Sequence, residues 1–66
     1  MIIKSFGKRL CTFCGDTMVY FMFEGSPLGA CACGNTDECF GEKTPADVMK
    51  RYGDRMEPYE VWVEAN

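Results

Sequence analysis

Two short cysteine pairs are the residues of this sequence best suited to chemistry. The first pair lies in Cys11-Thr12-Phe13-Cys14-Gly15 and the second in Cys31-Ala32-Cys33-Gly34. Zinc prefers four nitrogen or sulfur ligands in a tetrahedron, and structural zinc sites are commonly built from four thiolates. The chain has no histidine, so an all-sulfur site is the familiar form that it can supply. We therefore predict one structural Zn²⁺ ion, held by Cys11, Cys14, Cys31 and Cys33.

A glycine directly follows each cysteine pair, and we expect both glycines to shape the metal-binding turns. Gly15 and Gly34 can adopt a positive φ angle, which lets backbone N–H groups approach the sulfurs and offset part of the negative charge of four thiolates. The second pair is one residue shorter than the first, so its turn must differ. Cys39, the fifth cysteine, is an alternative ligand that would replace Cys31 or Cys33.

This pattern resembles the zinc-ribbon group, whose members carry two such cysteine knuckles on neighbouring hairpins. The resemblance covers residues 11–34, and the first pair with its glycine fits it well. The second pair departs from it, because Cys31 precedes Cys33 by two positions instead of three. The resemblance implies a metal-clasped β-hairpin in a small binding module. A weaker likeness, of the segment from Cys31 to Gly41 to the SEC-C zinc motif, again draws attention to Cys39.

Iron and thiol redox chemistry are the minor alternatives for these cysteines. Two knuckles with four cysteines also resemble rubredoxin, which binds a single iron, although the spacer is much shorter here. The pair Cys11 and Cys14 has the spacing of a redox motif, but such motifs need a helix N-terminus to lower a thiol pKa, and a strand is expected here. Without histidine there is no Ser-His or Cys-His pair, and a four-thiolate zinc has no open position for substrate. We therefore expect no enzyme.

The size of the chain favours a metal as the stabilising element. Residues 1–66 are expected to form a single domain, for which a hydrophobic core alone is marginal. A structural zinc contributes on the order of 10–16 kcal/mol of apparent binding free energy. The N-terminus lacks an apolar segment of signal-peptide length, which predicts a cytoplasmic protein with reduced thiols. The odd number of cysteines, five, also argues against a complete set of disulfides.

The elements expected around the cysteines form a small α+β domain with a zinc-ribbon-like β-hairpin. A β-branched and aromatic run predicts a strand over residues 17–23, in which Tyr20 and Met22 share one face. The turn-forming residues 24–29 predict a reversal of the chain. Residues 28–33 would then return beside the strand and bring the two cysteine pairs together.

One helix and two terminal strands are expected outside this hairpin. Thr44 as the N-cap, followed by a proline, predicts a short helix over residues 45–52, with Gly53 at its C-terminal end. Apolar residues predict a strand over residues 2–6, which the next glycine would end. Clean alternation predicts a C-terminal strand over residues 59–64. These two strands are natural pairing candidates.

Charge and exposed apolar residues indicate a protein partner. The net charge is −3, and an acidic chain is a poor general binder of phosphate. Trp62 lies among glutamates, and the strand over residues 17–23 is apolar on both faces, so a partner or a second copy of the chain could cover one of them. We expect a non-enzymatic zinc-binding module that acts through protein–protein interaction, with Trp62, Tyr20 and Met22 as contact residues. By analogy, such a module would regulate a larger, transcription-type machine.

The alternative function is nucleic-acid binding by the N-terminal segment. Residues 1–15 carry three basic and no acidic side chains, whereas the rest of the chain carries four basic and ten acidic ones. Lys4, Lys8 and Arg9, with the neighbouring Phe13, would then form the contact. Zinc ribbons often bind nucleic acids, so the resemblance favours this alternative while the net charge opposes it.

Overall fold

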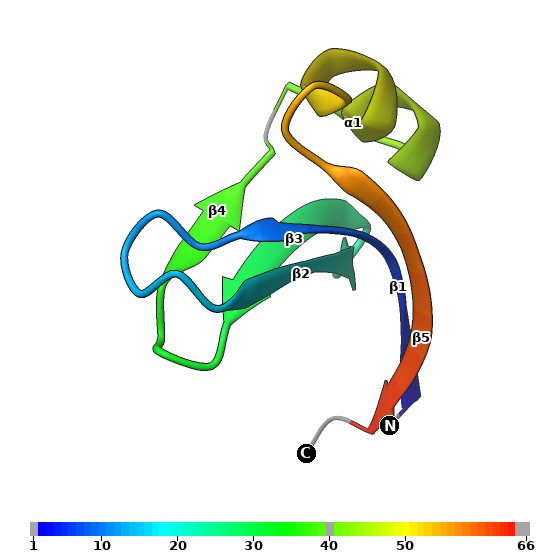
Figure 1. Cartoon of the computed structure of the whole chain (residues 1–66). Helices are drawn as coiled ribbons and strands as arrows, with labels where there is room; N and C mark the ends of the chain where they lie inside the picture. The colour runs from blue at the N-terminus through cyan, green and yellow to red at the C-terminus, as the bar shows by residue number, and fades with distance from the viewer. Residues whose placement is uncertain (1, 40, 65–66) are drawn as a thin grey trace.

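The computed structural model describes residues 2–39 and 41–64, and they form an antiparallel five-stranded sheet with one short helix (Figure 1). The strand order is β4-β3-β2-β1-β5. The prediction of a small α+β architecture is therefore confirmed. The elements in chain order are β1 (Ile2–Leu10), β2 (Thr17–Phe23), β3 (Ser26–Cys31), β4 (Thr36–Glu38), α1 (Pro45–Tyr52) and β5 (Glu57–Glu64).

The hairpin formed by β2 and β3 has a tighter turn than the sequence predicted. Phe23 pairs with Ser26, so that only Glu24 and Gly25 connect the two strands. Their φ angles are +50° and +81°, as in the type I′ turns that match the twist of paired strands. The prediction of a turn over residues 24–29 is wrong in its extent, because residues 26–29 of that segment belong to β3.

The first strand is longer than predicted and does not end at Gly7. β1 continues to Leu10, and a β-bulge between Ser5 and Gly7 interrupts its register with both neighbouring strands. A Cβ atom at Gly7 would lie 2.7 Å from the sulfur of Met56. The glycine therefore allows the close packing of Met56 against the strand instead of terminating it.

The terminal strands pair as predicted, and they curve together along one side of the molecule (Figure 1). β1 runs antiparallel to β5, with Lys4 opposite Trp62 and Lys8 opposite Glu57. The sequence placed the last strand over residues 59–64, and the structure extends it back to Glu57. Strand β4, in contrast, was not predicted, because three polar residues show neither β-propensity nor apolar alternation.

Helix α1 spans the predicted residues and begins at the predicted cap. The hydroxyl of Thr44 accepts a hydrogen bond of 3.2 Å from the backbone N–H of Asp47. At the other end, Gly53 has a φ angle of −56°, so it is right-handed and not the left-handed cap that glycine often provides. No helix in the described part of the chain combines the length and apolar character needed to cross a membrane.

The core lies between one face of the sheet and the helix. Strand β2 directs Met18 and Tyr20 into this core, where they are fully buried, while Val19 and Phe21 on its opposite face are partly exposed. Phe6, Met49 and Tyr52 pack around the edge of the core. Its buried members are Cys11, Met18, Tyr20, Cys31, Cys39, Val48 and Met56.

Candidate metal centre

Both cysteine pairs lie at the same end of the sheet, on the turns that join β1 to β2 and β3 to β4 (Figure 1). We call residues 11–15 the first knuckle and residues 31–34 the second knuckle. In the first knuckle, the N–H of Gly15 donates to the carbonyl of Cys11 at 2.9 Å. In the second, the N–H of Gly34 donates to the carbonyl of Cys31, also at 2.9 Å. Turns of different length are thus closed by the same kind of bond.

Both knuckle glycines have the positive φ angle that the sequence predicted. The angle is +80° at Gly15 and +96° at Gly34. A Cβ atom at either position would have no neighbour within 4 Å. The requirement for glycine is therefore conformational, because other residues rarely adopt these angles.

The four cysteines of the two knuckles come together as the sequence predicted. Their sulfur atoms all lie within 4.8 Å of one another. Sulfurs are 3.8 Å apart between Cys11 and Cys33, and 3.4 Å apart between Cys14 and Cys31. A disulfide would need about 2.05 Å. Four sulfurs that each lie about 2.3 Å from one tetrahedral ion are separated by about 3.8 Å, so the arrangement fits a metal ion.

Backbone and side-chain donors make the thiol of Cys11 more acidic than an ordinary cysteine. The N–H groups of Cys14 and Phe13 and the side-chain amide of Asn35 donate to its sulfur, and they lower the pKa of Cys11 to about 6. At Cys14, the N–H of Asp16 acts in the same direction, but bonding to neighbouring sulfurs outweighs it and raises the pKa of this thiol to about 12. Four thiolates this close repel one another, and a cation would relieve that repulsion.

Each knuckle contributes one buried and one exposed cysteine. Cys11 and Cys31 are 3% and 8% exposed, whereas Cys14 and Cys33 are exposed. A bound ion would therefore sit at the surface, with protein on one side of it. Beside it, Leu10 is 71% exposed and the ring of Phe13, on the first knuckle, is 82% exposed.

The fifth cysteine lies apart from this group. Cys39 is 3% exposed and packs in the core with residues such as Val48. Burial raises the pKa of its thiol, which keeps it protonated at neutral pH. The alternative in which Cys39 replaces a ligand of the second knuckle is therefore disfavoured.

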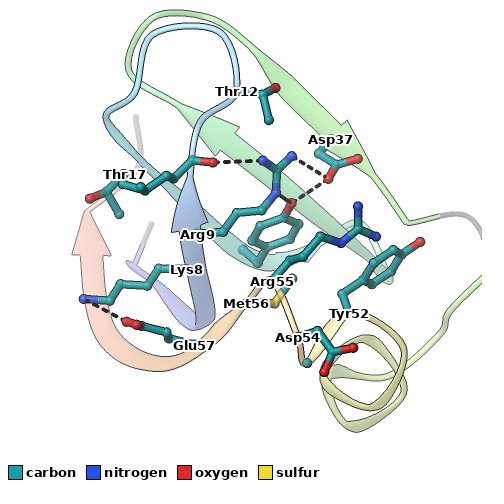
Figure 2. Close-up of a pocket in the computed structure, with 13 residues that line it drawn as sticks. Lys8, Arg9, Thr12, Thr17, Asp37, Tyr52, Asp54, Arg55, Met56 and Glu57 are labelled. Atoms are coloured by element: carbon teal, nitrogen blue, oxygen red, sulfur yellow. Dashed lines mark hydrogen bonds and ion pairs between the residues drawn. The ribbon is translucent and has the colours of Figure 1, made fainter.

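A polar network that the sequence did not reveal lies behind the knuckles. The Nε atom of Arg9 donates to the hydroxyl of Tyr20 at 2.6 Å, and this hydroxyl donates to a carboxylate oxygen of Asp37 at 2.5 Å. Arg9 also donates to the same carboxylate oxygen at 3.0 Å and to the carbonyl of Leu10 at 3.0 Å (Figure 2). The network joins β1, β2 and β4, and so fixes the strands that carry both knuckles.

The expectation that Tyr20 contacts a partner is wrong, because this network holds its side chain inside the protein. Its side chain is only 1% exposed, because the ring belongs to the core and the hydroxyl is enclosed by Arg9 and Asp37. Met22 is partly exposed. The backbone of Trp62 pairs with Lys4 in the sheet, but its side chain lies outside the described part of the structure.

The basic residues of the N-terminal segment each face a carboxylate. Lys4 forms an ion pair with Glu60, and the ammonium of Lys8 lies 3.8 Å from Glu57. Arg9 is bound within the network described above. Among the residues expected to contact nucleic acid, only the ring of Phe13 extends freely into solvent.

From the hydrogen bonds of Tyr20 in this network we predict how the stability of the protein changes at alkaline pH. Burial, together with the hydrogen bond to Asp37, raises the pKa of Tyr20 to about 12. The ordinary tyrosine pKa is about 10, so the stabilisation by Tyr20 is present below pH 10 and is lost as the pH rises toward 12. Phenolate absorbance should show one tyrosine ionising near pH 12, and Tyr20→Phe should remove that transition. If the variant keeps the transition, another tyrosine is responsible.

Comparison with known protein families, curated proteins and solved structures gives no match for this chain. The zinc-ribbon resemblance therefore rests on the cysteine pattern and its geometry. The observations together describe four cysteines positioned to hold a metal ion, at one end of a small antiparallel sheet.

Proposed function

We propose that this chain is a non-enzymatic, zinc-binding module of zinc-ribbon type that acts by binding another protein. The observation that carries the proposal is the exposure of Leu10 and Phe13 beside the cysteine cluster, at 71% and 82%. Large apolar side chains gathered in one exposed place are typical of interaction sites. The metal would hold the turn that presents them.

The geometry of the sulfurs supports a single structural ion. Two pairs of sulfurs face each other across the knuckles, and N–H groups point at them, as a four-thiolate site requires. All four positions would be filled by protein, which leaves none for a substrate. Iron suits the same four thiolates, and zinc is proposed because this site needs no redox chemistry to do its structural work.

The ion pairs of the N-terminal segment favour a protein partner over nucleic acid. Lys4, Lys8 and Arg9 are each compensated by a carboxylate within the same molecule. Phosphate binding would have to compete with these contacts, in a chain whose net charge is −3. Nucleic-acid binding therefore remains the second candidate, supported by the exposed ring of Phe13 alone.

The contact residues that we now propose differ from those expected on sequence grounds. Leu10 and Phe13 take the place of the buried Tyr20. Trp62 and Met22 stay as proposed contacts on the terminal strand and the hairpin. A regulator that docks on a larger protein machine is the class of function that such an arrangement suits, and a second copy of the chain is an alternative partner.

Retention of protein from an extract of the source organism tests this proposal. The metal-loaded chain is expected to retain a nuclease-resistant protein partner, and the double variant L10S/F13S is expected to lose it. Phe23→Ser is the matched control, because Phe23 is also exposed, at 44%, but lies at the far end of the β2–β3 hairpin. Loss of retention with this control alone would place the contact at the tip of the hairpin and contradict its assignment to Leu10 and Phe13.

The nucleic-acid candidate has its own measurement. If it is correct, affinity for oligonucleotides falls steeply with salt and is lost in Lys8→Glu, because released counterions dominate such binding. That result would overturn the protein-partner proposal. If no oligonucleotide binds at low salt, the second candidate is excluded.

A further inference from the structure

An open cleft of about 930 Å³ lies between the end of β1 with the adjoining first knuckle and the turn that follows α1 (Figure 2). Its volume lies within the range of about 300–1,000 Å³ that is usual for ligand sites. Leu10 and Thr12 line one wall, and Tyr52, Arg55 and Met56 line the other. The cleft thus opens beside Leu10, the exposed apolar residue that directly precedes the first knuckle.

Most charged groups in this cleft are already paired. All three nitrogen positions of the Arg9 guanidinium donate to Tyr20, Leu10 or Asp37. The ammonium of Lys8 faces Glu57. These groups form the walls of the cleft, and they offer little to a ligand.

Among the basic groups of the cleft, Arg55 is the exception. No ion pair joins its guanidinium to a carboxylate within the described residues, and it lies 5.7 Å from the centre of the Tyr52 ring. Figure 2 shows it extending between Tyr52 and Asp37, while the carboxylate of Asp54 points away from it. The ring restrains this side chain at the mouth of the cleft, because arginine stacks favourably on aromatic faces.

Three basic and three acidic side chains line the cleft, but Arg55 has no direct carboxylate partner among the described residues. Burial raises the pKa of Asp37, but the hydrogen bonds from Tyr20 and Arg9 lower it more, and the charge of Arg55 adds a smaller effect in the same direction. Asp37 forms its direct ion pair with Arg9, and Arg55 acts on it only through a longer-range charge interaction. A carboxylate supplied by a ligand would give Arg55 a direct partner and could bind it in the bidentate geometry that guanidinium groups favour.

We infer that this cleft binds a segment of a partner protein in which an acidic side chain lies close to an apolar one. The carboxylate binds Arg55, and the apolar side chain packs on Leu10, which is 71% exposed. This inference rests on the proposed function and specifies its partner. The guanidinium of Arg55 favours an acidic side chain in the partner, and the exposed side chain of Leu10 favours an apolar residue beside it.

Selection from a displayed library of random 12-residue peptides tests the inference with a defined probe. The metal-loaded full chain is expected to enrich peptides that carry Asp or Glu near a large apolar residue. Arg55→Glu and Leu10→Ser are expected to weaken the selected peptides by at least about tenfold, as measured by fluorescence anisotropy. Arg51→Glu is the matched control, because Arg51 lies near the same ring, at 5.9 Å, but pairs with Glu42 outside the cleft.

A charge exchange separates a direct contact from a structural effect. Replacing the acidic residue of a selected peptide by lysine should abolish binding to the parent chain and restore it to Arg55→Glu, with metal content and circular dichroism unchanged. Failure to enrich acidic–apolar peptides, equal binding by Arg55→Glu and the parent, or an equal effect of Arg51→Glu would overturn the inference. If peptides fail while retention of a partner still depends on Leu10 and Phe13, the cleft inference falls and the proposed function stands.

Discussion

Replacing Cys14 by serine is expected to release the metal and unfold the domain, whereas replacing Cys39 by serine retains both. Cys14 belongs to the sulfur cluster, and Cys39 lies in the core apart from it. A structural zinc contributes on the order of 10–16 kcal/mol, which is comparable to the total stability of a typical folded protein, about 5–15 kcal/mol. Loss of one ligand therefore removes most of what holds the fold. Circular dichroism and elemental analysis of the purified variants measure both effects.

The control in this comparison is demanding, because Cys39 is the more deeply buried of the two residues. A hydroxyl at that position costs about 1–3 kcal/mol if it finds no hydrogen bond, so Cys39→Ser should be somewhat less stable but still metal-bound. If Cys39→Ser loses the metal and Cys14→Ser keeps it, the ligand set is wrong. If the parent chain, purified without added metal, holds less than about half an equivalent of zinc and has reactive thiols, the metal proposal itself is wrong.

Gly29→Ala is expected to destabilise the protein by about 1–3 kcal/mol, as is typical of overpacking in a dense core. A Cβ atom at Gly29 would lie 2.6 Å from a ring carbon of Tyr20, which is far inside normal contact distance. The ring cannot move aside freely, because Arg9 and Asp37 hold its hydroxyl at 2.6 and 2.5 Å. Either the strands separate or this network breaks. Chemical denaturation of the metal-loaded protein measures the loss.

Gly41→Ala provides the matched substitution for this test. Its added methyl group would lie 3.6 Å from the end of the flexible Arg51 side chain, which is an ordinary contact. We expect Gly41→Ala to change the free energy of unfolding little. A second readout links the effect to the network: the transition of Tyr20 near pH 12 should move to lower pH in Gly29→Ala. Equal stability of the two variants would show that the sheet absorbs the extra methyl group without strain.

The sequence was most informative where a structure depends on neighbouring residues. The knuckle glycines, the cap at Thr44 and the length of α1 are set by the local backbone, and each was predicted correctly. The sulfur cluster could be anticipated for the same reason, because two short chelating turns need only one hairpin to bring them together. These features depend on few contacts between residues that are far apart in the sequence.

Features that depend on long-range contacts were not visible in the sequence. Nothing local shows that Asp37 lies beside Tyr20, since the two are brought together only when β4 pairs with β3. A tyrosine in an apolar run looks like a contact residue until its hydroxyl finds buried partners. Gly7 and Gly29 were similarly ambiguous, because the role of Gly7 depends on the distant Met56 and that of Gly29 on the exact register with Tyr20 across the hairpin.

The alternation of buried and exposed sulfurs in the two knuckles has a kinetic consequence. Cys14 and Cys33 face solvent, while Cys11 and Cys31 are covered. A competing chelator or an oxidant can therefore approach from one side only, and it meets one sulfur from each turn first. Exchange of the ion would proceed stepwise, with the inner pair holding it until last. That inner pair consists of the first cysteine of each turn. Both turns would therefore release the ion at Cys14 and Cys33 first, while Cys11 and Cys31 still link the two turns through the ion.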